Sequence, residues 1–192
     1  DLIIYAEQYY ILYAKSQNLQ TTNIMENIFY LQRALETPFA PVVQALCRIN
    51  TQEQYIRYKY LFKMHCNFLI MRSYIQLASR YDKEDIYFYN YYYKELIIES
   101  LKYAKYYYEL ALPYWEEAKK EALNASRFQN YKIELDTWED EHAKIISGYY
   151  KYDEIIYQRL ENLLRNLAFL ENWANSFYGD TQDSSNSENT GQ

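Results

Sequence analysis

Histidine, the side chain most often used for acid–base catalysis and metal binding, occurs only twice in the chain, at His65 and His142. His142 follows Glu139 at the spacing Glu-x-x-His, which carboxylate di-metal bundles use to hold their ions. Such a site needs a second copy of the motif and two further glutamates, and the sequence has no second copy. We therefore predict two buried, hydrogen-bonded rings rather than metal ligands or catalytic bases.

Carboxylates are concentrated around this motif, where they could bind a metal ion or transfer protons with His142 as the one nitrogen ligand. The lysines among them suggest a different structure, because pairs such as Glu116 with Lys120 and Asp140 with Lys144 stand four residues apart on a helix. We favour a solvated helix face. The acidic residues in question are Glu116, Glu117, Glu121, Glu134, Asp136, Glu139, Asp140 and Glu141.

The sequence lacks the residues that other common catalytic motifs require. Three glycines in 192 residues supply neither a phosphate-binding loop nor a nucleophile elbow. Cys47 and Cys66 lie on different predicted helices, and two buried free thiols are favoured over a disulfide, which would need Cα atoms within about 7 Å. The net charge of −6 disfavours non-specific nucleic-acid binding. We predict that the protein is not an enzyme and uses neither a metal nor a cofactor.

The elements that carry these residues are predicted to be long helices. Tyrosine occurs 26 times at helical spacing, whereas glycine and proline occur three times each. We predict an all-α domain of about seven helices over residues 1–178 and a disordered polar tail over 179–192. Thr51-Gln-Glu-Gln54 reads as a capping box that opens a helix over 52–81, and apolar residues on two faces of this helix predict neighbours on both sides. Pro113 marks either a kink or the start of a new helix.

A repeat signal lies in the middle of the chain. Tyr74-x-x-Leu77-Ala78-x-x-Tyr81 matches the first helix of a tetratricopeptide repeat, and Ala104-x-x-x-Tyr108-x-x-Ala111 matches the second. The two halves are separated by about fourteen residues more than the repeat of about 34 allows. The sequence therefore predicts tetratricopeptide-like hairpins, arranged as a short array or as an irregular bundle.

The excess residues carry the aromatic cluster Tyr87-Phe-Tyr-Asn-Tyr-Tyr-Tyr93. One interpretation is an extended segment with alternate side chains buried. The other is a docking surface, because tyrosine-rich patches anchor protein–protein interfaces at low entropic cost. Residues 84–93 could be either buried or exposed on this reasoning.

A family resemblance covers about a third of the chain. The residues that carry it are Arg57-Tyr-Lys-Tyr-Leu-Phe-Lys-Met-His65, Leu77-Ala-Ser-Arg-Tyr-Asp-Lys83, Tyr87-Phe-Tyr-Asn90, Glu99-Ser-Leu101 and Pro113-Tyr-Trp-Glu-Glu117. This stretch resembles spirochaete motility proteins, which look like tetratricopeptide-type helical proteins of the collar around the periplasmic flagellar motor. The resemblance implies a periplasmic scaffold that is tethered through a membrane segment upstream of Asp1.

We expect a protein–protein interaction scaffold whose partners are other proteins, such as flagellar collar components, or further copies of the chain. The competing hypothesis is a small-molecule module with a tyrosine-lined pocket. An enclosed cavity with converging polar groups would favour the small molecule, and a shallow aromatic groove would favour a protein. In the repeat register, the partner-binding residues are Arg72, Ile75, Ser79 and Asp82 on a concave face, bordered by Tyr87, Phe88, Tyr89, Tyr91 and Tyr92.

Overall fold

A computed structural model describes residues 4–17, 23–82 and 93–179, and these residues form helices without a strand. The elements are α1 (Ala6–Gln17), α2 (Ile24–Glu36), the 3₁₀ turn η1 (Val42–Gln44), α3 (Gln52–Tyr81), α4 (Lys94–Ser126), α5 (Asp136–Ile146) and α6 (Tyr152–Gly179). The all-α prediction is confirmed. The aromatic segment up to Tyr92 and the predicted polar tail beyond residue 179 lie outside the described residues.

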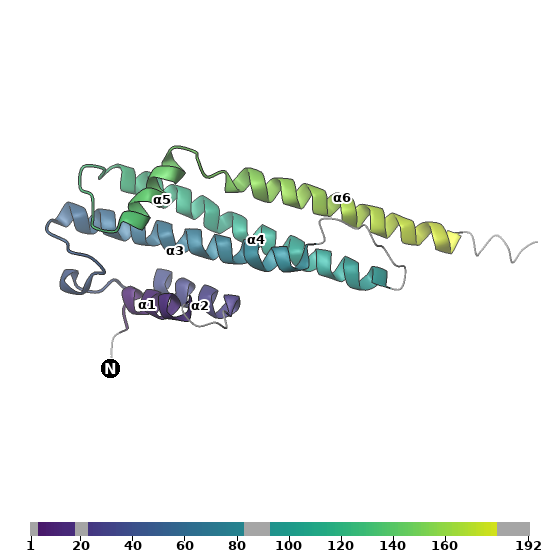
Figure 1. The fold of residues 1–192 in the computed structure, drawn as a ribbon, viewed down its shortest axis with the longest axis horizontal. Helices are drawn as coiled ribbons and strands as arrows, with labels where there is room; N and C mark the ends of the chain where they lie inside the picture. The colour runs from purple at the N-terminus through teal and green to yellow at the C-terminus, as the bar shows by residue number, and fades with distance from the viewer. Residues whose placement is uncertain (1–3, 18–22, 83–92, 180–192) are drawn as a thin grey trace, which may run out of the picture.

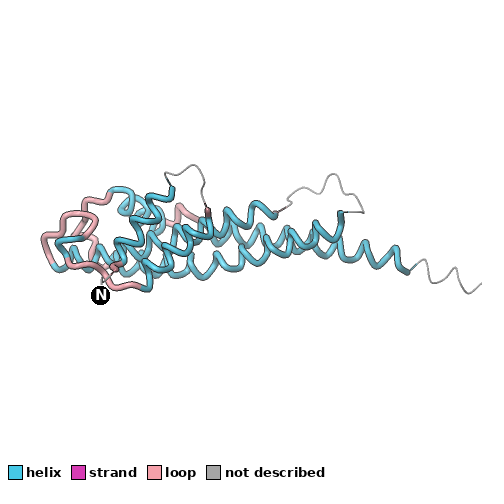
Figure 2. Tube along the Cα trace, turned by 90° about the horizontal axis from the view of Figure 1, so that it is seen from below, coloured by secondary structure: helices cyan, strands magenta, loops and turns pink. Residues whose placement is uncertain are grey.

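Helices α3 and α4 form a long antiparallel hairpin that runs along most of the elongated molecule, and the end of α6 extends beyond it (Figures 1 and 2). As predicted, Thr51 caps α3, because its hydroxyl oxygen accepts a hydrogen bond from the Gln54 backbone N–H at 3.1 Å. The side chain of Gln54 instead reaches back to the N–H of Asn50 at 2.8 Å, one residue earlier than a standard capping box requires.

Small residues line the face of α4 that is buried in the bundle. Ala104, Ala111, Ala118, Ala122 and Ala125 are all fully buried, and alanine at such positions lets two helix backbones approach closely. The hairpin thus has the residue pattern predicted for a helical repeat, but α3 and α4 contain 30 and 33 residues. Each is about as long as a whole tetratricopeptide repeat. The molecule is therefore an irregular bundle, one of the two arrangements predicted.

The other helices pack on both sides of this hairpin. Helices α1 and α2 cover one face of α3, α6 runs along α4, and the short α5 contacts both α3 and α4 near one end of the hairpin (Figure 1). Helix α3 is consequently the centre of the bundle and has buried residues such as Tyr58, Cys66 and Met71 around much of its circumference. The prediction of neighbours on both sides of this helix is confirmed.

Several predicted boundaries are wrong. Of the two alternatives for Pro113, the start of a new helix is not observed: α4 continues through this residue, which is exposed, so the carbonyl freed four residues earlier can be solvated. The helical register of Tyr131, Leu135 and Trp138 predicts a helix over 128–147, but α5 begins only at Asp136. The backbone before it is bound by side chains instead: Gln54 donates to the Lys132 carbonyl and Glu139 accepts from the Ile133 N–H. At α2, the position of Thr22 before an apolar helical pattern predicts that it is the N-cap. The cap is instead Asn23, which accepts from the N–H groups of Met25 and Glu26.

Candidate functional site: a groove over helix α3

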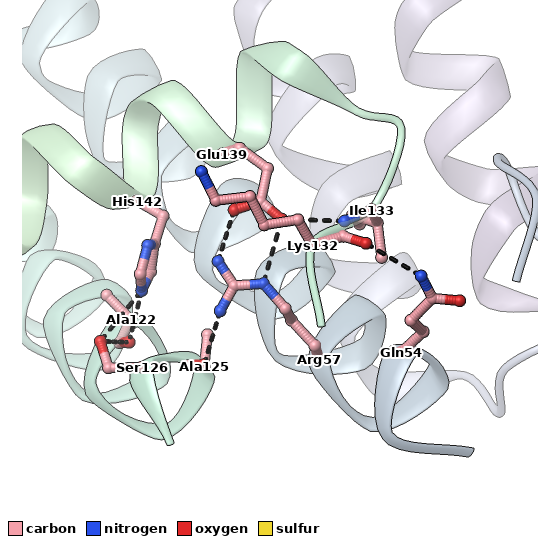
Figure 3. Close-up of polar contacts among 9 residues, drawn as sticks. All are labelled: Gln54, Arg57, Ala122, Ala125, Ser126, Lys132, Ile133, Glu139 and His142. Carbon is pink, nitrogen blue, oxygen red and sulfur yellow. Dashed lines mark hydrogen bonds and ion pairs between the residues drawn. The ribbon is translucent and has the colours of Figure 1, made fainter. Parts of the chain in front are cut away.

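A buried ion pair holds α5 and its preceding connection against the hairpin (Figure 3). The Nε of Arg57 donates to Glu139 at 3.0 Å, its Nη2 makes a second contact with the same carboxylate, and its Nη1 donates to the Ala125 carbonyl at 2.6 Å. Glu139 also accepts from the Ile133 N–H at 3.1 Å. Burial alone would raise the pKa of Glu139, but these hydrogen bonds and the charge of Arg57 outweigh burial, so the pKa is lowered.

The second histidine of the chain attaches the next turn of α5 to α4. His142 Nε2 lies 3.1 Å from the Ala122 carbonyl and 3.0 Å from the Ser126 hydroxyl, as Figure 3 shows. A nitrogen beside a carbonyl oxygen must carry the hydrogen, so the neutral ring donates to α4. Burial and, to a lesser degree, the charge of Arg57 lower the pKa of His142. Its role in this structure is to join α5 to α4.

A second polar cluster joins α1, α3 and α5. His65 Nδ1 lies 2.5 Å from the Glu141 carboxylate, and His65 Nε2 lies 3.0 Å from the Tyr10 hydroxyl. Trp138 stacks on the His65 ring at a centroid distance of 5.2 Å. Burial raises the pKa of Tyr10 to about 12, so this hydroxyl keeps its proton and donates to the ring. The cluster fixes the position of α1 relative to α3.

Glu7 adds a further attachment for α1. Its carboxylate is almost fully buried and accepts from the Tyr58 hydroxyl at 3.1 Å and the Ala40 N–H at 2.9 Å. Because a buried carboxylate is costly without donors, these two bonds define where α1 can sit. Helix α1 is thus held rigidly at one side of α3, and its next turns form the wall of a groove.

This groove has a volume of about 500 Å³ and runs over the middle of α3. Its floor consists of Leu69, Arg72, Ser73, Ile75 and Gln76 on α3. Tyr13 on α1 and Asn27 on α2 form one wall, and Tyr152 at the start of α6 forms the other. Four elements therefore meet around one concave surface, which is open to solvent at the exposed side chains of Arg72 and Gln76.

An aromatic cluster supports the floor and the α6 wall of the groove. Tyr152 packs against Phe68 at 5.6 Å and against Trp115 at 5.4 Å between ring centroids. The Arg72 guanidinium carbon lies 5.8 Å from the centroid of Phe68. Rings held in this way present a fixed surface, which lowers the entropic cost of binding.

The structure brings together only some of the residues predicted for partner binding. Arg72 and Ile75 lie side by side on the groove floor. Ser79 is exposed on the next turn of α3, and Asp82 ends that helix, where its carboxylate accepts from the Tyr108 hydroxyl at 3.0 Å. The remaining predicted residues, Tyr87, Phe88, Tyr89, Tyr91 and Tyr92, lie outside the described residues.

Tyr74 and Tyr81, which occupy positions of the repeat pattern, pack helix against helix at the far end of the hairpin. Tyr74 packs against Tyr107 and Tyr114 at centroid distances of 6.4 and 5.7 Å, and Tyr81 packs against Tyr103 and Tyr107 at 5.5 and 5.9 Å. These rings connect α3 with α4. They are a structural population, distinct from the tyrosines of the groove walls.

The two wall tyrosines were not predicted as site residues. Tyr13 was recognisable only as part of an apolar face of α1, and nothing in the local sequence of Tyr152 distinguishes it from other tyrosines. Both line the groove because α1 and the start of α6, which are far apart in the chain, each contact α3. The sequence does show that the helical neighbours of Arg72 on its face of α3 are uncharged, which singles out this arginine. That pattern does not reveal which side chains of other helices lie opposite Arg72.

Histidine and cysteine are the side chains on which the metal and thiol predictions depend. Both histidines are buried and hydrogen-bonded, as predicted. Within the described residues, no group of three or more histidine, cysteine, aspartate or glutamate side chains is placed to hold a metal ion. Cys47 and Cys66 are free thiols, as predicted, although Cys47 is only half-buried.

The expected surface pairs are partly correct. Asp140 and Lys144 form the predicted pair at 2.6 Å. The predicted pairing of Glu116 with Lys120 is wrong, because Glu116 contacts Lys119 at 2.8 Å while Lys120 contacts Glu117 at 3.0 Å. Both partners are three rather than four residues away, which the helix surface also permits.

Comparisons with known proteins give one match. Residues 53–173 match the family described as Domain of unknown function (DUF8513), a range that contains α4 and α5 and nearly all of α3. No curated protein and no solved structure matches the chain. Among the described residues, every helix is too short or too polar to cross a bilayer. Because the match spans more than half of the sequence, the chain belongs to the DUF8513 family.

Proposed function

We propose that this protein is a non-enzymatic scaffold that binds a segment of another protein in the groove over α3. The observation that carries the proposal is the groove itself, whose walls come from α1, α2 and α6 and whose floor comes from α3. Aromatic and aliphatic side chains that are pre-positioned by a rigid bundle are typical of surfaces that anchor protein partners.

The shape of the groove supports a protein partner over a small molecule. Sites for small molecules bury most of the ligand surface inside a concave pocket. Here Arg72 and Gln76 are exposed on the floor, so a ligand of small size would remain largely in solvent. An extended or helical segment of a protein can instead follow the groove and contact both walls.

The buried polar contacts support a positioning role for the remaining residues. Glu7, Tyr10 and His65 fix α1, whereas Arg57 and Glu139 fix α5, and both histidines are engaged in such contacts. We propose that these groups hold the groove walls in place and take no part in a reaction.

The resemblance to spirochaete motility proteins extends the proposal to a cellular setting. On that basis the scaffold would assemble components of the periplasmic flagellar collar and would be anchored through a region outside this chain. The aromatic segment that contains Tyr87, Phe88 and Tyr89 would then border the same binding surface.

A pull-down from the source organism tests the proposal with matched variants. Gln76→Trp places a large ring in the groove at an exposed position, and Gln129→Trp makes the same change at an exposed position between α4 and α5. We expect Gln76→Trp to lose the captured proteins and Gln129→Trp to retain them, with equal helicity by circular dichroism. Equal capture by both variants would exclude the groove as the binding site. Replacing Tyr87, Phe88 and Tyr89 by alanine tests the aromatic border in the same assay, where weaker capture with near-normal helicity is expected.

A further inference from the structure

Besides the amide of Gln76, the groove is lined by hydrogen-bond donors on three helices for which the described residues supply no hydrogen-bond partner. They are the Tyr13 hydroxyl on α1, the Arg72 guanidinium on α3 and the Tyr152 hydroxyl on α6. By contrast, the hydroxyls of Tyr10, Tyr55, Tyr58 and Tyr108 elsewhere in the bundle each have a hydrogen-bond partner. The feature that matters here is that two phenols and a guanidinium from three helices line one concave surface.

Arg72 is the only charged residue that lines the described groove. No acidic side chain of the described residues lies within ion-pair distance of its guanidinium, although the chain as a whole has a net charge of −6. The guanidinium group of Arg72 packs over the ring of Phe68, and this contact restrains the guanidinium. Its N–H groups point outward in the plane of the group and stay available for hydrogen bonds. Such a restrained fork is suited to two parallel hydrogen bonds with a carboxylate.

The wall tyrosines are electrostatically linked to this arginine. Burial raises the pKa of both Tyr13 and Tyr152, and the positive charge of Arg72 partly offsets the effect. Both phenols therefore remain protonated at neutral pH and can donate. Glu141, whose charge also acts on both phenols, is already engaged by His65 at 2.5 Å.

We propose that the groove selects an acidic protein segment, in which one aspartate or glutamate carboxylate binds Arg72 and accepts from the hydroxyls of Tyr13 and Tyr152. This inference rests on the proposed function and adds the chemistry of the partner. The side chains of Leu69 and Ile75 on the same floor provide an apolar surface for a neighbouring aliphatic residue of the segment. An acidic residue adjacent to an apolar one is thus the recognised pattern.

Selection from a random library of 12-residue displayed peptides tests the pattern without knowledge of the natural partner. Purified wild-type protein is compared with Arg72→Gln, Arg72→Glu and the groove-blocking Gln76→Trp. Circular dichroism and thermal melting confirm that each variant is folded, as expected because Arg72 and Gln76 are exposed. Binding of individual selected peptides is then measured by fluorescence anisotropy.

We expect wild-type pools enriched in Asp or Glu beside an aliphatic residue, and binding that Gln76→Trp abolishes. Arg72→Gln should weaken these peptides roughly 10- to 100-fold, the range for a hydrogen bond to a charged group. Arg72→Glu should select peptides enriched in Lys or Arg. Tyr13→Phe and Tyr152→Phe, which remove only the hydroxyls, should each weaken binding several-fold.

Two different failures can be distinguished. Peptides that Gln76→Trp excludes, but that have no acidic preference or bind Arg72→Gln equally well, would overturn the acidic-segment inference and leave the groove as a protein-binding site. Failure of the wild-type protein to select any peptide that Gln76→Trp excludes would overturn both the inference and the proposed function.

Discussion

Replacing Glu139 by leucine would remove one partner of the buried ion pair and leave the Arg57 guanidinium without its carboxylate. The side chain of Arg57 is 2% exposed and that of Glu139 is 14% exposed, so water can do little to compensate for the loss. The remaining acceptor of Arg57 would be the Ala125 carbonyl. The substitution therefore tests whether the pair holds α5 and residues 127–135 against α3.

The magnitude follows from the cost of an unpaired buried charge. Breaking a buried pair by removing one partner costs about 3–5 kcal/mol of the free energy of unfolding. The same variant also removes the acceptor of the Ile133 N–H, and the free-energy cost of that lost hydrogen bond is included in this range. For a domain of this size, about 1 kcal/mol shifts Tm by roughly 2–4 °C, so the expected decrease is roughly 6–20 °C.

The assay is urea denaturation combined with thermal melting, monitored by circular dichroism, for Glu139→Leu, Arg57→Met and the double variant. The double variant contains no buried charge at this place, so we expect it to be only about 1–2 kcal/mol less stable than the wild type. The two single effects would then be strongly non-additive. As a matched control, Glu161→Leu breaks an exposed pair with Arg165, whose atoms are 3.9 Å apart, and should leave Tm nearly unchanged.

Two results would refute this reasoning. One is a Glu139→Leu variant within about 1 kcal/mol of the wild type, which would mean that the pair contributes little in its folded context. The other is additivity of the single substitutions in the double variant, which would mean that Arg57 and Glu139 act independently.

Three further predictions follow from the packing and the pKa shifts. His142→Gln keeps a donor for the Ala122 carbonyl but removes the titrating ring. Because the pKa of His142 is lowered in the folded protein, its contribution to stability is present above about pH 6.5 and is lost as the pH falls through the folded pKa. In urea titrations, the wild type should therefore lose more stability than the variant between about pH 7.5 and 5.5, and equal losses would contradict this. Burial raises the pKa of the thiols of Cys47 and Cys66, but only Cys66 is fully buried, so Cys47 should react first when the native protein is treated with iodoacetamide. Mass spectrometry measures the two rates, and faster modification of Cys66 would be inconsistent with the fold. Ala111→Leu should overpack the buried face of α4 and lower the free energy of unfolding, measured by urea denaturation, by about 1–3 kcal/mol. The same change at the exposed Ala14 should leave stability nearly unchanged, and a larger loss at Ala14 than at Ala111 would refute the packing.

Local signals predicted the central helix well because they lie within a few residues of one another. Thr51 and Gln54 define the start of α3, and its two apolar faces predicted the neighbours on both sides. The placement of Arg72 and Ile75 on one face followed from the same helical spacing. These are properties of a single helix, and no long-range contact is needed to infer them.

The errors arise where long-range contacts determine local structure. Residues 128–135 have helical periodicity, but Gln54 donates to the Lys132 carbonyl at 3.0 Å and Arg57 fixes Glu139, contacts that span 78 and 82 positions. Pro113 would end an isolated helix, yet packing of alanines on both sides of it keeps α4 continuous. The opposing positions of Tyr13 and Tyr152 depend on how α1 and α6 pack around α3, which sequence spacing does not encode.

Site-specific photo-crosslinking in the source organism tests most directly whether the groove over α3 binds a protein segment. A photoreactive phenylalanine analogue is placed at Gln76 on the groove floor and, as a control, at Gln129 between α4 and α5, both of which are exposed. Our account predicts a discrete crosslinked protein at position 76 that is absent at position 129 and disappears when Arg72→Glu is added. The same crosslinked product at both positions would contradict the account, whereas its persistence in Arg72→Glu would overturn only the inference that the segment is acidic.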